Sequence, residues 1–132
     1  MNIKYNINKN ISANDFIEIL TNSTLRQRRP IDDLETIKSM IENADIMITA
    51  SIDNKIVAMA RAVTDFSYCC YLSDLAVDTK YQNMGIGKKL ISKVQEQLNN
   101  KCKIILLSAP NATEYYAKIG FSQHNSAWVL SK

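Results

Sequence analysis

The chain has 132 residues, of which 46% are apolar and 22% are charged, and its formal net charge is +3 at pH 7. This length and balance suit one globular domain, so we expect a single domain over residues 1–132. The small, scattered positive charge does not indicate a nucleic-acid surface. No run approaches the ~20 apolar residues that a membrane-spanning helix needs. We therefore expect neither a nucleic acid nor a membrane as a partner.

The first residues and the cysteines indicate a reducing compartment. Residues 1–6 alternate polar and apolar side chains and lack the apolar core of a secretion signal, so we expect a cytoplasmic protein. The three cysteines are an odd number, and two of them are adjacent, which does not predict a disulfide framework. One histidine and no CxxC pair leave too few ligands for a metal ion, so no metal is expected.

In the N-terminal third, the apolar pattern predicts a strand at 3–7 followed by two helices. Ser12 can cap the first helix, with Asp15 three residues later in the capping-box position. Asp32 or Asp33 begins the second helix. The loop between the helices is rich in arginine and ends at a proline.

The rest of the chain alternates strands and helices. The runs 46–52 and 56–63 are joined by turn-forming residues and predict a hairpin. A long strand at 68–77 and an amphipathic helix at 87–98 follow. The remaining elements are a short buried strand, a short helix and a final two-stranded hairpin, at 104–107, 112–119, and 121–124 with 127–130. This order predicts a mixed α/β domain with both antiparallel and parallel pairing.

The most informative segment is the Gly-x-Gly turn of Gly85 and Gly87, which opens the helix after the long strand. The N-terminus of a helix offers unpaired N–H groups and a partial positive charge, and glycine lets a ligand approach the backbone closely. Lys88 adds positive charge. The turn is not a Walker A loop, because the pattern GxxxxGK[ST] is absent, and it is not a dinucleotide fingerprint, because position 90 is Leu rather than the third Gly of GxGxxG. Taken alone, it indicates a pyrophosphate site or a turn that only begins a helix.

Two motifs resemble the signatures of one family. Gln82-x-x-Gly85-x-Gly87, which follows Leu75-Ala76-Val77, resembles the acetyl-CoA signature of the GCN5-related N-acetyltransferase (GNAT) superfamily. Residues 112–121 resemble its second signature, A-x-x-F-Y-x-x-x-G-F, in which Tyr116 matches the tyrosine and Tyr115 stands where Phe is common. The resemblance implies a GNAT-like α/β fold: a mixed, mostly antiparallel twisted sheet, flanked by helices and splayed between the fourth and fifth strands.

The resemblance also implies acetyl-CoA as a co-substrate and the residues that bind it. The main chain of Leu75, Ala76 and Val77 is expected to bond to the pantetheine arm. The residues expected to wrap the pyrophosphate are Gln82, Asn83, Met84, Gly85, Ile86, Gly87 and Lys88. The family often has an asparagine where this chain has Ala109, and Asn111 is the alternative cofactor contact.

The implied reaction is direct attack of an amine on the thioester in a ternary complex. Tyr116 is the expected general acid for the departing thiolate, since a tyrosine is protonated at neutral pH; its alternative is a core tyrosine. Asp74 is the catalytic candidate for deprotonating the amine, beside Glu114 and a water chain, and this choice stays open. A main-chain N–H near Val77 is the natural oxyanion donor. A covalent mechanism through the adjacent cysteines is the less favoured alternative.

The acceptor is expected to be a small-molecule amine that also carries a carboxylate, such as an amino acid or its derivative. Arg28 and Arg29 can bind an anion through bidentate hydrogen bonds, or form a solvated loop. Arg61, a charge inside an apolar strand, is a second anion-binding candidate, and Ser73, beside Asp74, is a further substrate-binding candidate. Acetylation of a protein or peptide amine and a non-catalytic acyl-CoA-binding module are the alternatives, and a homodimer through the C-terminal strands is an open expectation.

Overall fold

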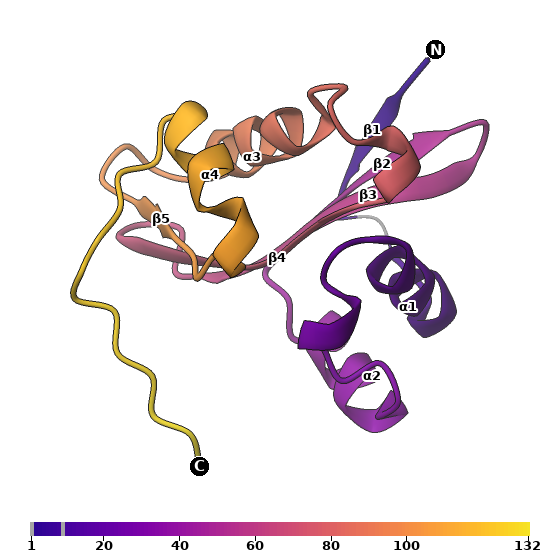
Figure 1. Ribbon diagram of the computed structural model, residues 1–132, viewed down its shortest axis with the longest axis horizontal. Helices are drawn as coiled ribbons and strands as arrows, with labels where there is room; N and C mark the ends of the chain where they lie inside the picture. Colours follow the sequence, from indigo (N-terminus) through magenta and orange to yellow (C-terminus); the bar gives the residue numbers. More distant parts are fainter. Residues whose placement is uncertain (1, 9) are drawn as a thin grey trace.

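The computed structural model describes residues 2–8 and 10–132. Five strands form one sheet in the order β1-β2-β3-β4-β5 (Figure 1). The strands are β1 Lys4–Ile7, β2 Ile46–Ile52, β3 Lys55–Thr64, β4 Cys69–Val77 and β5 Lys103–Ile105. Strands β1 to β4 pair antiparallel, and β5 pairs parallel with β4. The predicted mixed, mostly antiparallel sheet is confirmed.

Helices cover both faces of the sheet, with α1 and α2 on one side and α3 on the other (Figure 1). The helices are α1 Ala13–Asn22, α2 Leu34–Glu42, α3 Ile86–Glu96 and α4 Thr113–Lys118, and the 3-10 turns are η1 Arg26–Arg28, η2 Thr79–Tyr81 and η3 Pro110–Ala112. The predicted helices are confirmed, with ends shifted by a few residues. Because helices lie on both sides, β2 is buried along its whole length, as expected for a strand that is mostly apolar.

Local sequence explains where α1 and α2 begin. The Ser12 hydroxyl accepts from the Asp15 N–H at 3.0 Å, and the Asp33 carboxylate accepts from the Thr36 N–H at 3.1 Å. Such side-chain caps satisfy N–H groups that have no partner within the helix. Both helices bury their apolar faces, including Phe16, in a core between them and the sheet. This packing places the α1–α2 loop beside β4.

Strand β4 contains a bulge at Ser73. The register with β3 steps from Asp74 opposite Arg61 to Leu72 opposite Ala62, so Ser73 has no partner on β3. A bulge of this kind sets two residues of one strand against one of its neighbour and re-aims the side chains.

The bulge changes which layer the side chains of β4 reach. Leu72 and Leu75, three residues apart, both pack in the core beneath α3, although strict alternation would place them on opposite faces. Ala76 belongs to the core beneath α1 and α2. Alternation without a bulge predicts Ser73 and Asp74 on opposite faces, whereas both side chains contact the same arginine, as described below.

The sheet opens between β4 and β5. The pairing of these strands runs only from Cys69 with Lys103 to Tyr71 with Ile105, whereas β4 continues to Val77. The predicted splay between the fourth and fifth strands is therefore present. It leaves the second half of β4 without a neighbour on that edge and opens the sheet next to α3 and α4.

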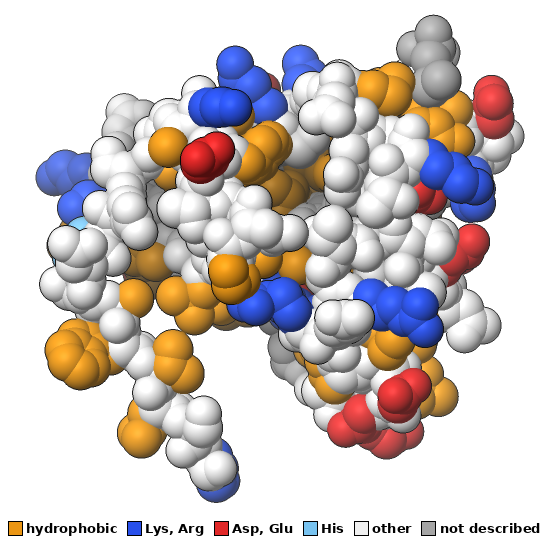
Figure 2. Space-filling view, in the orientation of Figure 1, with side chains coloured by type: hydrophobic (Ala, Val, Ile, Leu, Met, Phe, Trp, Pro, Cys, Tyr) orange, Lys and Arg blue, Asp and Glu red, His pale blue; other side chains and the backbone are white. Residues whose placement is uncertain are grey.

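The predicted final hairpin at 121–124 and 127–130 is wrong. Residues 121–132 carry no strand, and the segment runs away from the body of the molecule (Figures 1 and 2). The apolar side chains of residues 128–130 face solvent, with exposed fractions of 91% for Trp128 and 97% for Leu130. The alternating residues have strand propensity, but a strand needs a neighbour to pair its backbone, and none pairs with this segment in the described chain.

Candidate active site

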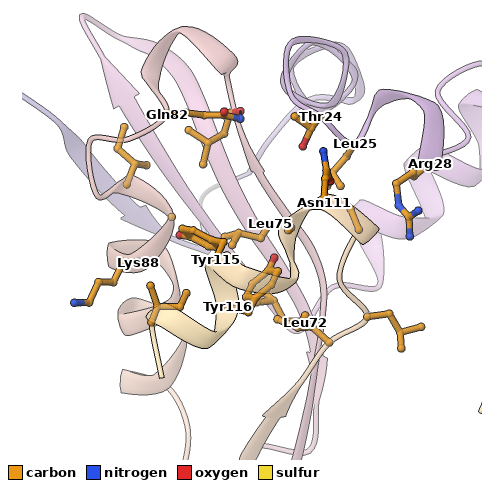
Figure 3. Close-up of a pocket in the computed structure, with 18 of the residues that line it drawn as sticks. Thr24, Leu25, Arg28, Leu72, Leu75, Gln82, Lys88, Asn111, Tyr115 and Tyr116 are labelled. Atoms are coloured by element: carbon orange, nitrogen blue, oxygen red, sulfur yellow. Dashed lines mark hydrogen bonds between the residues drawn. The ribbon is translucent and has the colours of Figure 1, made fainter. Parts of the chain in front are cut away.

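A pocket of about 420 Å³ lies where β4 and β5 diverge. Its walls come from β4, the chain after β5, the first turn of α3, the α1–α2 loop and α4 (Figure 3). In Figure 3, Gln82 and Lys88 lie toward one end and Thr24 and Arg28 toward the other, with Tyr116 between them. This size and concave shape are typical of a ligand site.

One end of the pocket is the turn that precedes α3. Gly85 adopts φ 78° and has no side chain, so the N-terminus of α3 has no side-chain cap. Asn83 adopts φ 64°, also in the left-handed region. Gly85, Gly87 and Lys88 all line the pocket, and no acidic residue lies in the first turn. Free N–H groups beside a lysine form an anion site, so these residues fit a pyrophosphate.

The main chain of β4 faces the cleft at Val77. The Asp78 N–H donates to the Val57 carbonyl at 2.9 Å, toward β3. Successive residues of a strand direct their N–H and C=O groups to opposite sides, so those of Val77 and Leu75 point toward the open edge. The Val77 carbonyl accepts from the Gln82 side-chain amide there, at 3.4 Å. Because β5 has already diverged, these groups are available to a ligand.

Tyr115 and Tyr116, adjacent on α4, both line the pocket (Figure 3). Their rings meet edge to face with centroids 5.2 Å apart, and Tyr116 meets Phe121 in the same way at 5.4 Å. Burial, together with the neighbouring Tyr115, raises the pKa of Tyr116 to about 12, although the Arg29 guanidinium acts in the opposite direction. Tyr116 therefore keeps its proton at neutral pH.

A buried cluster of two arginines and one carboxylate lies behind the pocket wall. Asp74 is fully buried, and its two oxygens accept from Nε of Arg29 and Nε of Arg61. Arg29 also donates to the Ser73 carbonyl at 2.7 Å, and Arg61 donates to the Ser73 hydroxyl at 2.8 Å. The cluster has two positive charges and one negative charge, and it ties the α1–α2 loop to β4. Asp74 has no free oxygen facing the pocket.

The arginines differ in their access to the pocket. Arg28 and Arg29 line it, together with Ser73, whereas Arg61 does not. The side chain of Arg28 makes no hydrogen bond or ion pair with the other described residues, so its guanidinium is available. Arg61 is 7% exposed, and its remaining donor reaches the Met40 carbonyl at 3.4 Å. Arg61, expected from the sequence as an anion-binding candidate, is thus paired with Asp74 and lies outside the pocket lining.

The structure brings most of the predicted cofactor residues to the pocket. Leu75, Val77, Gln82, Asn83, Gly85, Ile86, Gly87, Lys88 and Asn111 line it, while Ala76 and Met84 do not. Ala76 faces the opposite core because of strand alternation, and Met84 is 42% exposed on the turn. Asn111 and Ala109 both line the pocket.

Other lining residues carried no signal in the sequence. They are mostly apolar or small side chains from separate elements: Thr24, Leu25, Leu72, Tyr81, Leu106, Leu107 and Ile119. Cys69, Cys70 and His124 are not among the lining residues, so the cysteine mechanism has no support from this geometry. Within residues 2–8 and 10–132, no three His, Cys, Asp or Glu side chains gather where they could hold a metal ion.

Among the described residues, no helix is both long enough and apolar enough to cross a membrane.

Known proteins with a similar sequence are N-acetyltransferases. The uncharacterized N-acetyltransferase ycf52 of Pyropia yezoensis is 29% identical over 120 residues, which cover 86% of this chain and 67% of that protein.

Solved structures share the fold. A probable acetyltransferase of unknown function from meticillin-resistant Staphylococcus aureus superimposes with a TM-score of 0.78, at 18% identity over 98% of this chain and 99% of the other. The aminoglycoside N-acetyltransferase AAC(6')-Iy, solved in complex with CoA, superimposes with a TM-score of 0.76 at 17% identity. The match covers 99% of this chain and 95% of that protein. The family model described as an acetyltransferase (GNAT) domain matches residues 19–129. The chain therefore belongs to the GNAT family of acyl-CoA-dependent N-acetyltransferases.

Proposed function

We propose that this acetyltransferase moves the acetyl group of acetyl-CoA to the primary amine of a small molecule that also carries an anionic group, such as an amino acid or its derivative. The observation that carries the proposal is that Arg28 and Arg29 both line the pocket, with Arg28 at the end away from the α3 turn (Figure 3). An aminoglycoside acetyltransferase with the same fold acts on a small molecule, according to its name.

Charge argues for an anionic acceptor. Arg29 and Arg61 share the single carboxylate of Asp74, and Arg28 has no acidic partner, so the wall keeps an excess of positive charge. Arg29 and Arg61 are largely withdrawn from water, where charges are normally paired, whereas Arg28 is exposed and its guanidinium is available to a carboxylate or phosphate. A bound acceptor with one negative group would supply the missing partner.

The proposed donor site uses the turn before α3 and the open edge of β4. Gln82, Asn83, Gly85, Ile86, Gly87 and Lys88 would hold the pyrophosphate. The main-chain groups of Leu75 and Val77 would hold the pantetheine arm, with Asn111 as a further contact. Met84 would contribute only main chain, since its side chain is outside the lining. Acetyl-CoA supplies the activated thioester, and the N–H near Val77 would stabilise the oxyanion.

Tyr116 is the proposed general acid. It lies between the donor end and the arginine end of the pocket, and its raised pKa keeps the proton that the thiolate would receive. Holding both substrates in one pocket supplies much of the rate by proximity. The neighbouring positive charge of Arg29 would stabilise negative charge that develops beside the tyrosine.

For the amine proton, we propose transfer to water, with Asp74 as a positioning residue. Both Asp74 oxygens are already bonded to arginine, so the carboxylate holds Arg29 in the pocket wall rather than reaching an amine itself. Arg61 supports the same carboxylate from the opposite side. This assignment makes Asp74 and Arg61 important for activity without direct contact with substrate.

The test is acetyl-CoA-dependent release of CoA thiol against a panel of amino acids, the matching amines without a carboxylate, polyamines, aminoglycosides and a lysine peptide. We expect turnover on an anionic amine. Arg28→Ala should raise its KM by about tenfold or more, since a charge-assisted hydrogen bond contributes about 1.5–3 kcal/mol. Arg26→Ala is the matched control, because Arg26 is an exposed arginine of the same loop outside the pocket lining.

Two results would contradict the proposal. Turnover restricted to the lysine peptide would indicate a protein acceptor. An equal effect of Arg28→Ala on an amino acid and on its amine without the carboxylate would mean that the arginine does not recognise an anion.

A further inference from the structure

The hydroxyl of Tyr115 lies against the turn proposed to hold the pyrophosphate, although Tyr116 is the tyrosine assigned to the chemistry. We propose that Tyr115 is a donor-binding residue, whose hydroxyl donates a hydrogen bond to a phosphate oxygen of acetyl-CoA. This inference rests on the donor site described under the proposed function, and it adds a contact from α4 to a site otherwise built from β4 and the start of α3.

Gly87 fixes the position of the hydroxyl. A Cβ atom added at Gly87 would lie less than 3.0 Å from the Tyr115 hydroxyl oxygen, closer than real Cβ atoms come, and 3.4 Å from the ring carbon that bears it. The hydroxyl therefore occupies the space that a side chain at Gly87 would fill, directly over the first turn of α3. In Figure 3 the Tyr115 ring points toward this helix, on the side of Lys88.

The surroundings of the hydroxyl favour an anionic partner. Tyr115 lines the pocket and is 39% exposed, and its hydroxyl makes no hydrogen bond with another described residue. The first turn of α3 has no side-chain cap and no acidic residue. Partial burial raises the pKa of Tyr115, so the hydroxyl stays protonated and can donate at neutral pH. A donor beside unpaired backbone N–H groups fits a phosphate oxygen.

The Tyr115 ring is held in place from the other side. It meets the Tyr116 ring edge to face, and Tyr116 is itself packed edge to face against Phe121. The hydroxyl is therefore oriented before a ligand arrives, and less conformational freedom is lost when it binds. The second family signature commonly has Phe at this position, so this chain carries a hydroxyl that the ring packing alone does not require.

The decisive experiment compares CoA with pantetheine, which lacks the phosphates, in calorimetric binding to the wild-type protein and to Tyr115→Phe. We expect Tyr115→Phe to weaken CoA binding by about tenfold, as for loss of a hydrogen bond to a charged group, and to change pantetheine binding less than twofold. In kinetics, the KM of acetyl-CoA should rise similarly, while that of acetyl-pantetheine should not. Equal affinities of both proteins for CoA would overturn the inference.

A second pair of variants tests the geometry. Gly87→Ala should lower the melting temperature, because the new methyl group meets the Tyr115 hydroxyl. The double variant Gly87→Ala with Tyr115→Phe should recover it, because the nearest ring carbon is then at an ordinary contact distance. Absence of recovery would show that the hydroxyl does not lie over Gly87. Failure of wild-type protein to bind CoA would instead refute the proposed donor site itself.

Discussion

Arg61 and Asp74 stand opposite each other on β3 and β4, beside the bulge at Ser73, and Nε of Arg61 donates to the fully buried Asp74 carboxylate. The other Asp74 oxygen accepts from Arg29, 45 residues earlier in the chain. One carboxylate thus compensates two guanidinium groups that have little access to water. Removing its charge would leave both without an acidic partner.

We expect Asp74→Asn to lower the free energy of unfolding by about 3 kcal/mol or more, as for breaking a buried ion pair. The free energy of unfolding can be measured by urea denaturation, with circular dichroism as the signal. Asp53→Asn is the control, since Asp53 is exposed in the β2–β3 turn, and it should be neutral. If Asp74→Asn kept wild-type stability and only catalysis were lost, the carboxylate would act as a base rather than as a positioning residue.

The pH dependence of catalysis should reflect Tyr116. The pKa of about 12 lies above the value of 10 for an ordinary tyrosine, so the acid form persists well into the alkaline range. We expect kcat/KM to rise with pH as the acceptor amine loses its proton, and to stay level to at least about pH 10. Tyr116→Phe should reduce kcat about 100-fold or more. The rise of kcat/KM on the acidic side of its pH profile should be the same in this variant as in the wild-type protein. A wild-type alkaline fall near pH 8 would contradict this assignment.

The same shift makes a prediction for stability. The folded-state pKa of Tyr116 is raised, so folding favours the neutral phenol. The associated stability is fully present below the unfolded pKa of about 10 and is lost as the pH rises from there toward 12. Thermal melting between pH 8 and 11 should show the decline, and Tyr116→Phe should lessen it. Equal declines in both proteins would assign the effect to other groups.

Thr49, on β2, has a buried hydroxyl oxygen without a hydrogen-bond partner among the described residues. Replacing such a group with an apolar group of the same shape removes a desolvation cost, so Thr49→Val should raise the free energy of unfolding by about 1 kcal/mol. Thr64→Val is the contrasting control, because the Thr64 hydroxyl donates to the Cys69 carbonyl at 2.6 Å and accepts from Phe66 N–H. It should be destabilising. Destabilisation by both variants would reveal a partner for Thr49.

Trp128 is the only tryptophan, and its 91% exposure predicts emission like that of tryptophan in water, with efficient quenching by iodide. A spectrum shifted to the blue would show that the C-terminal segment packs against something. If that shift disappeared on dilution, and gel filtration showed the mass halving, the partner would be a second copy of this chain, as expected for a homodimer.

The sequence was sufficient for features encoded locally. The caps at Ser12 and Asp33, the hairpin of β2 and β3, and the glycine turn before α3 all depend on neighbouring residues, and all three are present. The two motifs also led to the correct family and to the splayed sheet. Ordered signatures of this kind specify both an element and its neighbour, so they carry more information than periodicity alone.

Features that depend on distant segments could not be predicted in the same way. The contact between Arg29 and Asp74 joins a loop to a strand, and nothing near either residue indicates the other. The bulge at Ser73 follows from pairing with β3 rather than from any local signal. For residues 121–130, apolar alternation indicated strand propensity correctly but could not show whether a neighbouring strand is available.

The extra residue in β4 is not needed to keep the flanking side chains on their faces. Without Ser73, Leu72 and Leu75 would be two residues apart, and strict alternation would still place both beneath α3 and Asp74 on the opposite face. Its loss would instead remove the carbonyl that accepts from Arg29 and the hydroxyl that accepts from Arg61. The added residue therefore serves the two guanidinium groups, and its deletion should weaken their anchoring while leaving the sheet correctly layered.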